Sequence, residues 1–147
     1  HNPRIIDERG QIVNILQAGK FYTYMYDVEF LDECKNVSFG MMIKSVTGVE
    51  ISGYANIAME QTWIVRANAK STVTPSFRLK CDLVQGTYFL NSGVIGTTAA
   101  GETCYLARTL DITAFKVVTV EPNPIRGFTN MSYQFDIRKS SFHSDAT

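Results

Sequence analysis

The chain alternates apolar and polar residues in short segments along most of its length. A period of two places successive side chains on opposite faces of a β-strand, whereas helical spacing is never sustained here beyond two turns. The clearest early example spans residues 21–30, where every second position is aromatic or apolar: Tyr22, Tyr24, Tyr26, Val28 and Phe30. We therefore predict an all-β protein in which this aromatic face is buried.

The alternation continues in further segments separated by turn residues. Val37, Phe39, Met41 and Ile43 are predicted to face the core, with Ser38, Gly40, Met42 and Lys44 on the outer face. Other strands are expected at 4–6, 12–16, 51–57, 71–79, 88–96, 103–108 and 113–120, with 58–67 as an irregular crossing that includes a helical turn. Eight or nine short strands with regular turns predict an immunoglobulin-like antiparallel β-sandwich.

Residues 79–96 carry the most informative local pattern. Leu83, Gly86 and Tyr88 have the spacing of a tyrosine corner, in which the tyrosine hydroxyl reaches back across a tight turn to the backbone just upstream. Tyr88 is therefore predicted to stabilise the fold. In the strand that follows, Asn91 and Gly93 share the opposite face, which sets a polar group beside a position without a side chain.

The last apolar alternation lies near the C-terminus, at Met131, Tyr133, Phe135 and Ile137. It follows a proline-containing stretch, residues 121–124, and a loop of about ten residues. A strand on so long a connection can pack on its own sheet or cross to a second copy and complete the neighbour's sheet. We predict the second arrangement, a homodimer with an exchanged C-terminal strand.

Length and charge narrow the class of protein. The 147 residues fit one domain, 1–147, and 14 basic against 14 acidic residues leave no net charge, which argues against a nucleic-acid partner. No apolar run is long enough to span a bilayer and no signal peptide is evident, so direct membrane insertion is not expected. Because the chain begins with His1 rather than methionine, we expect a fragment of a longer polypeptide.

The sequence offers little for catalysis or for a metal or other cofactor. The two histidines, His1 and His143, lie at the chain ends, and the three cysteines form no CxxC pair. Adjacent carboxylates occur at predicted turns or exposed strand faces, where solvated charge is the usual explanation. Gly19-Lys20 lacks the other P-loop positions, which are occupied by Asn14 and Phe21. We predict a protein that is not an enzyme and needs no cofactor.

A binding surface for carbohydrate is the function that the remaining residues favour. Sugars are held by aromatic faces and by amide or guanidinium groups, and such side chains occur on several predicted strands. The candidate carbohydrate-binding residues are Met42, Tyr54, Asn56, Trp63, Phe89, Asn91, Tyr105 and Arg108. Structural roles are the alternatives: half-buried strand positions for the two tyrosines, a core plug for Trp63 and an ion pair for Arg108.

The order of motifs resembles one known family. The resemblance is carried by 12–16 with Gly19, by 26–30, by 37–40 with 43–44, by Gly48 with 51–53, and above all by the Gly-Thr-Tyr-Phe-Leu-Asn sequence at 86–91. From Arg4 to Tyr133 the chain is similar to the C-terminal domain of Wzt proteins. Those are the ATPase subunits of ABC transporters that export finished O-antigen polysaccharides across the bacterial inner membrane.

The resemblance implies a non-catalytic domain that binds the capped, non-reducing end of an O-antigen polysaccharide. It also implies dimerisation through the last strand, an ATPase domain upstream on the same chain, a transporter membrane subunit as partner, and a cytoplasmic location at the inner membrane. It supplies no site motif that can be transferred residue by residue. Lys44 and Arg108 could meet an anionic cap. The alternatives are a protein-binding immunoglobulin-like domain and a carbohydrate-binding module of an unrelated glycan-active enzyme.

Overall fold

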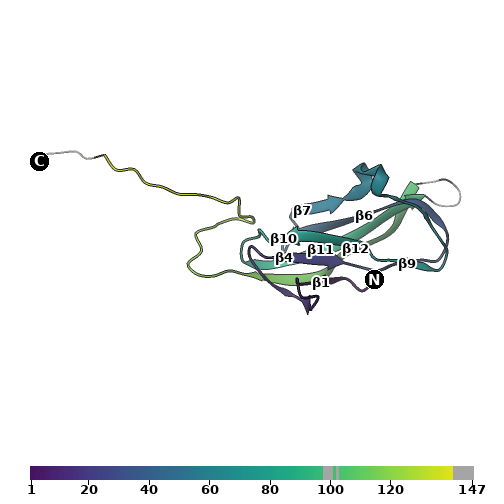
Figure 1. Ribbon diagram of the computed structural model, residues 1–147, viewed down its shortest axis with the longest axis horizontal. Helices are drawn as coiled ribbons and strands as arrows, with labels where there is room; N and C mark the ends of the chain where they lie inside the picture. Colours follow the sequence, from purple (N-terminus) through teal and green to yellow (C-terminus); the bar gives the residue numbers. More distant parts are fainter. Residues whose placement is uncertain (98–100, 102, 141–147) are drawn as a thin grey trace, which may run out of the picture.

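Two β-sheets packed face to face form the body of the protein (Figure 1). The computed structural model describes residues 1–97, 101 and 103–140, and for 103–112 the backbone alone. The smaller sheet has the order β10-β4-β1-β2, formed by Ser76–Lys80, Phe21–Met25, Arg4–Ile6 and Ile12–Val13. Its strand pairs are all antiparallel.

The six-stranded sheet has the order β3-β12-β11-β6-β7, with β8 also paired to β6. Its strands are β3 (Ile15–Gln17), β12 (Thr103–Val118), β11 (Gly86–Thr97), β6 (Cys34–Ser45), β7 (Glu50–Ala55) and β8 (Ile64–Ala67). The described pairs are antiparallel except for β3, which runs parallel to β12. A short ribbon pairs β5 (Val28–Phe30) with β9 (Ser71–Val73). The predicted immunoglobulin-like β-sandwich is confirmed.

One hydrophobic core lies between the sheets. The five aromatic and apolar positions predicted to be buried between 22 and 30 are all buried, and Tyr24 is fully inaccessible. From the facing sheet, Val37, Phe39, Met41 and Ile43 are also buried, as the alternation predicts. The period-two pattern therefore identified the core face of both sheets correctly.

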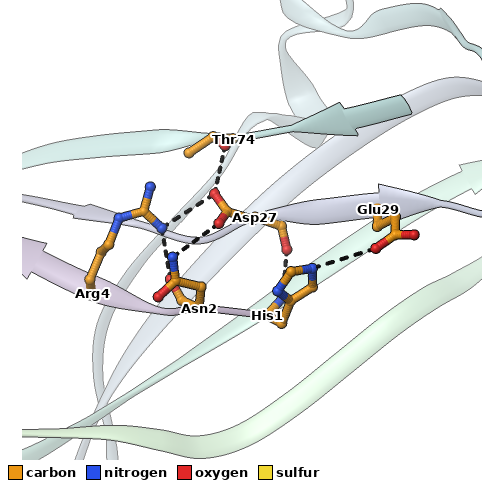
Figure 2. Close-up of polar contacts among 6 residues, drawn as sticks. All are labelled: His1, Asn2, Arg4, Asp27, Glu29 and Thr74. Carbon is orange, nitrogen blue, oxygen red and sulfur yellow. Dashed lines mark hydrogen bonds and ion pairs between the residues drawn. The ribbon is translucent and has the colours of Figure 1, made fainter. Parts of the chain in front are cut away.

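The predicted strand 21–30 is interrupted at Asp27 (Figure 2). The Asp27 carboxylate accepts hydrogen bonds from Thr74 at 2.7 Å, from Asn2 at 3.1 Å and from Arg4 at 3.2 Å. The hydrogen bond from Thr74 contributes most to lowering the pKa of Asp27, which favours the charged carboxylate. Side-chain bonds to two other segments thus hold the break that passes the chain from β4 to β5.

Other predicted boundaries shift for identifiable reasons. The 12–16 strand divides at Asn14, so that β2 and β3 join different sheets. The 71–79 strand divides into β9 and β10 around Thr74-Pro75, where proline lacks a backbone N–H. The predicted strands 103–108 and 113–120 are one strand, β12, with an irregular register between Leu90 and Ser92 of its partner. The predicted strand 51–57 ends at Ala55, where the chain turns into a 3-10 helix, η1 (Asn56–Ala58). The expected crossing, 58–67, contains the helical turn η2 (Glu60–Thr62), but its last part is a strand, β8, which pairs with β6.

The predicted last strand, 131–137, is not a strand in the described chain. Residues 128–130 are held against 82–84 by backbone hydrogen bonds, and the chain beyond them leaves the body in an extended path (Figure 1). Its apolar side chains are largely exposed, with Phe135 at 86%. Of the two arrangements considered for residues 131–137, packing on the sheet of the same subunit is therefore wrong. Exchange of the strand with a second copy stays a prediction.

The tyrosine corner is present where the sequence places it. The Tyr88 hydroxyl donates a hydrogen bond of 2.5 Å to the backbone carbonyl of Val84. Gly86 has a φ of 154°, and a Cβ there would meet the Tyr88 ring and hydroxyl at 3.8 Å. Tyr88 is 3% exposed and stacks on Phe115, with ring centroids 5.6 Å apart. The corner thereby fixes the entry into β11.

Tyr88→Phe is expected to lower the free energy of unfolding by about 1–3 kcal/mol, because the partly buried carbonyl of Val84 loses its hydroxyl donor. Urea denaturation of the variant measures this loss. Tyr133→Phe, in the exposed tail, is the matched control and should leave the stability unchanged. Equal stability of the two variants would contradict a structural role for the corner.

Candidate functional site: a glycine-floored groove

The outer face of the six-stranded sheet is hollowed by a groove of about 410 Å³. We call it the glycine groove, because three glycines from three neighbouring strands line it: Gly40 of β6, Gly53 of β7 and Gly93 of β11. Its complete described lining is Ser38, Phe39, Gly40, Met41, Met42, Glu50, Gly53, Tyr54, Ala55, Ile57, Asn91, Ser92, Gly93 and Ile95. Members with core-facing side chains, such as Met41, can reach this face only through their backbone.

The floor of the groove is bare backbone. Gly40 and Gly93 are paired across β6 and β11, and a Cβ built on Gly93 would meet no atom within 4 Å. The space above Gly93 is therefore open. Gly53 is different, because a Cβ there would lie 2.6 Å from the Met41 carbonyl oxygen and 2.9 Å from the Met42 sulfur. The Met42 side chain thus already covers Gly53.

Two polar side chains flank the glycine pair along the strands. Asn91 lies opposite Met42, one step to one side of Gly40–Gly93, and Ser38 lies opposite Ile95, one step to the other side. Asn91 is 8% exposed and Ser38 is 3% exposed. Neither side chain has a hydrogen-bond partner among the residues that the structure describes. Two polar side chains of low exposure therefore face the groove without a side-chain hydrogen bond to the described residues.

Tyr26 supports the floor from the core side. Its hydroxyl donates to the backbone carbonyl of Gly40 at 2.8 Å and lies 3.1 Å from that of Gly93. Burial raises the pKa of Tyr26 above its ordinary value of 10.0, which keeps the hydroxyl protonated as a donor at neutral pH. The same tyrosine thus contacts both glycines of the floor and links the two sheets beneath it.

The groove brings together some of the predicted binding residues. Met42 and Asn91 line it from the outer face. Tyr54 pairs in register with core-facing Met41, so its ring lies on the side of the smaller sheet, edge-on to Phe77 with ring centroids 6.2 Å apart. Phe89 shares the outer face but lies opposite Lys44, beyond the described lining. No outward-facing aromatic side chain lines the groove within the described part of the chain.

Asn56 and Trp63 are occupied by contacts within the protein. The Asn56 side-chain oxygen accepts a 2.7 Å hydrogen bond from the Phe39 N–H, and its amide nitrogen donates to Thr62 Oγ1 at 3.0 Å. The Trp63 indole donates to the Asn56 carbonyl at 2.9 Å. These contacts hold η1 and η2 against β6, beside the groove.

Tyr105 and Arg108 lie on β12, next to β11. The backbone register places Tyr105 opposite Ile95 and Arg108 opposite Gly93. Their side chains lie outside the described residues. The predicted site thus divides into two groove residues, two residues of a neighbouring hydrogen-bonded cluster, and four at other or undescribed positions.

Sequence reasoning did not select Ser38, Gly40 or Gly53 for the site. The alternation already put Ser38 and Gly40 on the outer face with Met42, which was the available signal. Gly53 needed the pairing of β6 with β7, which the sequence does not give.

The described lining of the groove contains neither histidine nor cysteine. Within the described residues, no three His, Cys, Asp or Glu side chains converge on a metal-sized site. Glu50 is the one ionisable side chain of the described outer lining. Nor does the described part of the chain contain a helix with the length and hydropathy needed to span a membrane.

Comparison with known proteins identifies the family to which the chain belongs. A family model described as the Wzt C-terminal domain matches residues 1–131. The chain belongs to the Wzt C-terminal domain family. A crystal structure of the C-terminal domain of Wzt has a TM-score of 0.77 and 19% sequence identity, and the alignment covers 92% of this chain and 81% of that chain.

A second solved structure is more distant. It is a CARDB domain from Pyrococcus furiosus in complex with di-metal ions, at a TM-score of 0.45 and 14% identity, covering 80% of this chain and 89% of that chain. A search of curated proteins found no match. The match to the Wzt C-terminal domain thus establishes the family and the fold. The glycine groove is the surface feature of this chain from which its function is inferred.

Proposed function

We propose that the chain binds the capped, non-reducing end of an O-antigen polysaccharide in the glycine groove and thereby gives an ABC exporter its substrate specificity. Membership of the Wzt C-terminal domain family supports a role with the O-antigen ABC transporter. The observation that carries the groove assignment is Asn91, a nearly buried amide without a protein partner in the described chain. A ligand hydroxyl that bonds to this amide would add a hydrogen bond without breaking one within the described protein, and such a bond contributes to affinity.

The chemistry of the groove suits a sugar. An amide can donate to one hydroxyl and accept from another, and the Ser38 hydroxyl can do the same at the other end of the floor. The open space above Gly93 lets a sugar ring approach the backbone closely, whereas Gly40 is flanked by Ala55, whose Cβ lies 3.3 Å from an added Cβ. The groove has no aromatic platform in its described lining, so the apolar face of the sugar would pack on Met42 and the neighbouring aliphatic side chains.

The proposed cellular setting follows from the family. The domain would act without catalysis, next to an ATPase domain on the full-length chain and beside the membrane subunit, at the cytoplasmic face of the inner membrane. Incubation of the chain with the polysaccharide should release no reducing ends. Release of reducing ends that is lost on replacing a single Asp or Glu would show an enzyme instead.

Asn91→Ala is expected to weaken retention of the cognate O-polysaccharide on the immobilised chain by about tenfold or more, since one buried hydrogen-bonding group is worth roughly 1–3 kcal/mol. Affinity chromatography with polysaccharides of different serotypes measures it. Removing the terminal cap from the retained polymer should abolish retention of the wild-type chain.

The matched control is Ser76→Ala, at an exposed position of β10 in the other sheet. It should retain the polysaccharide like the wild type. If the chain ignores every polysaccharide, or if the two variants bind equally well, the groove is not the glycan site and a protein-binding sandwich becomes the better account.

We further propose a homodimer formed by the exposed tail. The four apolar side chains at alternate positions between 131 and 137 are 64–86% exposed, which is unfavourable in an isolated subunit. Pairing with a sheet edge of a second copy would bury them and satisfy their backbone groups. The anchored residues 128–130 set the point at which the tail leaves its own subunit.

Deleting residues 133–147 is expected to convert the dimer into a monomer, because the anchor at 128–130 stays while three of the four alternating apolar side chains are lost. Light scattering after size-exclusion chromatography measures the mass. Substituting serine at Tyr133, Phe135 and Ile137 in the full chain should act in the same direction. An unchanged dimer in both variants would refute strand exchange.

A further inference from the structure

The crossing between β7 and β8, residues 56–62, forms one wall of the glycine groove. Ala55, directly before the crossing, and Ile57 within it both line the groove. Ala55 pairs with Gly40 of the floor, and a Cβ built on Gly40 would lie 3.3 Å from the Ala55 Cβ. The path that the chain takes into the crossing therefore sets the width of the groove beside this half of the floor.

The hydrophobic core does not hold this wall in place. Neither η1 nor η2 contains a buried residue. Two large apolar side chains of the crossing, Ile57 and Met59, are 47% and 42% exposed. Segments with few buried apolar contacts open at a low cost in free energy. The position of the wall therefore depends on hydrogen bonds.

Asn56 makes hydrogen bonds to the middle and to the end of the crossing. Its backbone carbonyl accepts one from the Met59 N–H at 2.9 Å and one from the Trp63 indole at 2.9 Å. Its side-chain nitrogen donates to Thr62 Oγ1 at 3.0 Å. One residue at the start of the crossing thus ties the two 3-10 helices together.

The side chain of Asn56 also joins the wall to the strand that carries the floor. The register between β6 and β7 ends at Gly40 and Ala55. One residue further along β6, the Phe39 N–H donates to the Asn56 side-chain oxygen at 2.7 Å. The amide takes the place of a backbone partner, so the backbone of Asn56 is released to turn into η1. Because Phe39 lies between Ser38 and Gly40, this bond fixes the wall against the part of β6 that lines the groove.

Building on the proposed function, we propose that Asn56 is a positioning residue of the glycine groove. It does not touch the ligand, because its side-chain oxygen and nitrogen are both engaged within the protein. It holds the crossing 56–62 at the distance from β6 at which Ile57 packs against the bound non-reducing end. A wall that is held in place before binding spares the ligand the cost of ordering it.

The test is the Kd of the full chain for one O-polysaccharide with its terminal cap and for the same polymer after removal of the cap. Asn56→Ala should raise the Kd for the capped polymer about tenfold, because the wall no longer stands against the bound end. Asn56→Asp keeps an oxygen that accepts from the Phe39 N–H and should bind within about threefold of the wild type. Residual binding of the uncapped polymer should be the same in all three chains.

A milder variant and a ligand-free measurement complete the test. Thr62→Val removes one partner of the Asn56 amide and should raise the Kd for the capped polymer about threefold, even if Asn56→Ala does not fold. In Asn56→Ala without ligand, the amides of Phe39 and Met59 should exchange with solvent at least about tenfold faster. Amides around Tyr88 should exchange at the wild-type rate.

Tyr88→Phe is the matched control for a loss of stability alone. It removes a partly buried hydrogen bond at the start of β11, outside the groove lining, and should bind the capped polymer like the wild type. Wild-type affinity or wild-type amide exchange in Asn56→Ala would overturn this inference and leave the proposed function intact. Failure of Asn56→Asp to restore binding would do the same, since it would indicate that the amide contacts the ligand. A wild-type chain that binds no polysaccharide would overturn both.

Discussion

Replacing Gly93 with alanine is expected to weaken glycan binding by about 100-fold while leaving the fold as stable as before. Gly93 has no positive φ to accommodate, and a Cβ at this position meets no protein atom within 4 Å. Glycine in a strand interior usually costs stability relative to alanine, so the free energy of unfolding should be equal or slightly higher. The added methyl group, however, occupies the open space above the floor, where the sugar has to approach the backbone.

Isothermal titration calorimetry and urea denaturation together measure this separation of binding from stability. An affinity loss of about 100-fold is expected, since the methyl group excludes the ligand from the floor rather than removing one contact. Gly53→Ala is the informative contrast. Its Cβ would clash with the Met41 carbonyl oxygen at 2.6 Å, so that variant should lose stability as well. Undiminished binding by Gly93→Ala would show that the ligand does not reach the floor.

Alkali is expected to unfold the protein cooperatively above pH 10. Burial is the main cause of the raised pKa values of Tyr24, Tyr26 and Tyr88, whose ordinary value is 10.0. Below pH 10 these hydroxyls are protonated in both the folded and the unfolded chain, so the stability is fully present. Above pH 10 the unfolded chain loses protons that the folded chain keeps. Stability should therefore fall by up to about 1.4 kcal/mol per pH unit for each tyrosine.

Tyrosinate absorbance and far-UV circular dichroism, followed through the same pH titration, test this prediction. The two signals should share one transition for the buried tyrosines, because their ionisation requires unfolding. Tyr133→Phe, which changes only an exposed tail residue, should leave the midpoint of the dichroism transition unchanged. Complete ionisation of all tyrosines with the β-sheet signal intact would contradict the burial of these hydroxyls.

The core and the corner were predictable from the sequence because they depend on local patterns. Alternation identified the buried face from Tyr22 to Phe30. The spacing of Leu83, Gly86 and Tyr88 predicted a hydrogen bond from the tyrosine to the backbone just upstream, and the structure shows Val84 as the acceptor. Breaks within strands were harder to predict. The break at Asp27 depends on hydrogen bonds from Thr74 and Asn2, which are distant in sequence.

The candidate site was predictable only in part, because it is made by the register between strands. The sequence was enough to place Asn91 and Gly93 on the same face, because they are two residues apart on one strand. That Gly40 lies opposite Gly93 and that Gly53 lies beneath Met42 follows only from the pairing of β6 with β11 and β7. The same register places the Tyr54 side chain on the core side of the sheet. The sequence alone had suggested that its ring faces outward and contacts a sugar.

The most direct test of the glycan groove is an NMR titration of the isotopically labelled chain with an oligosaccharide that carries the cognate non-reducing end. The account predicts that the largest backbone amide shifts fall on the outer lining of the six-stranded sheet, at Gly40, Gly53, Asn91 and Gly93. They should disappear in Gly93→Ala, while the corner around Tyr88 stays unperturbed. Shifts confined to the four-stranded sheet, or unchanged by Gly93→Ala, would contradict it.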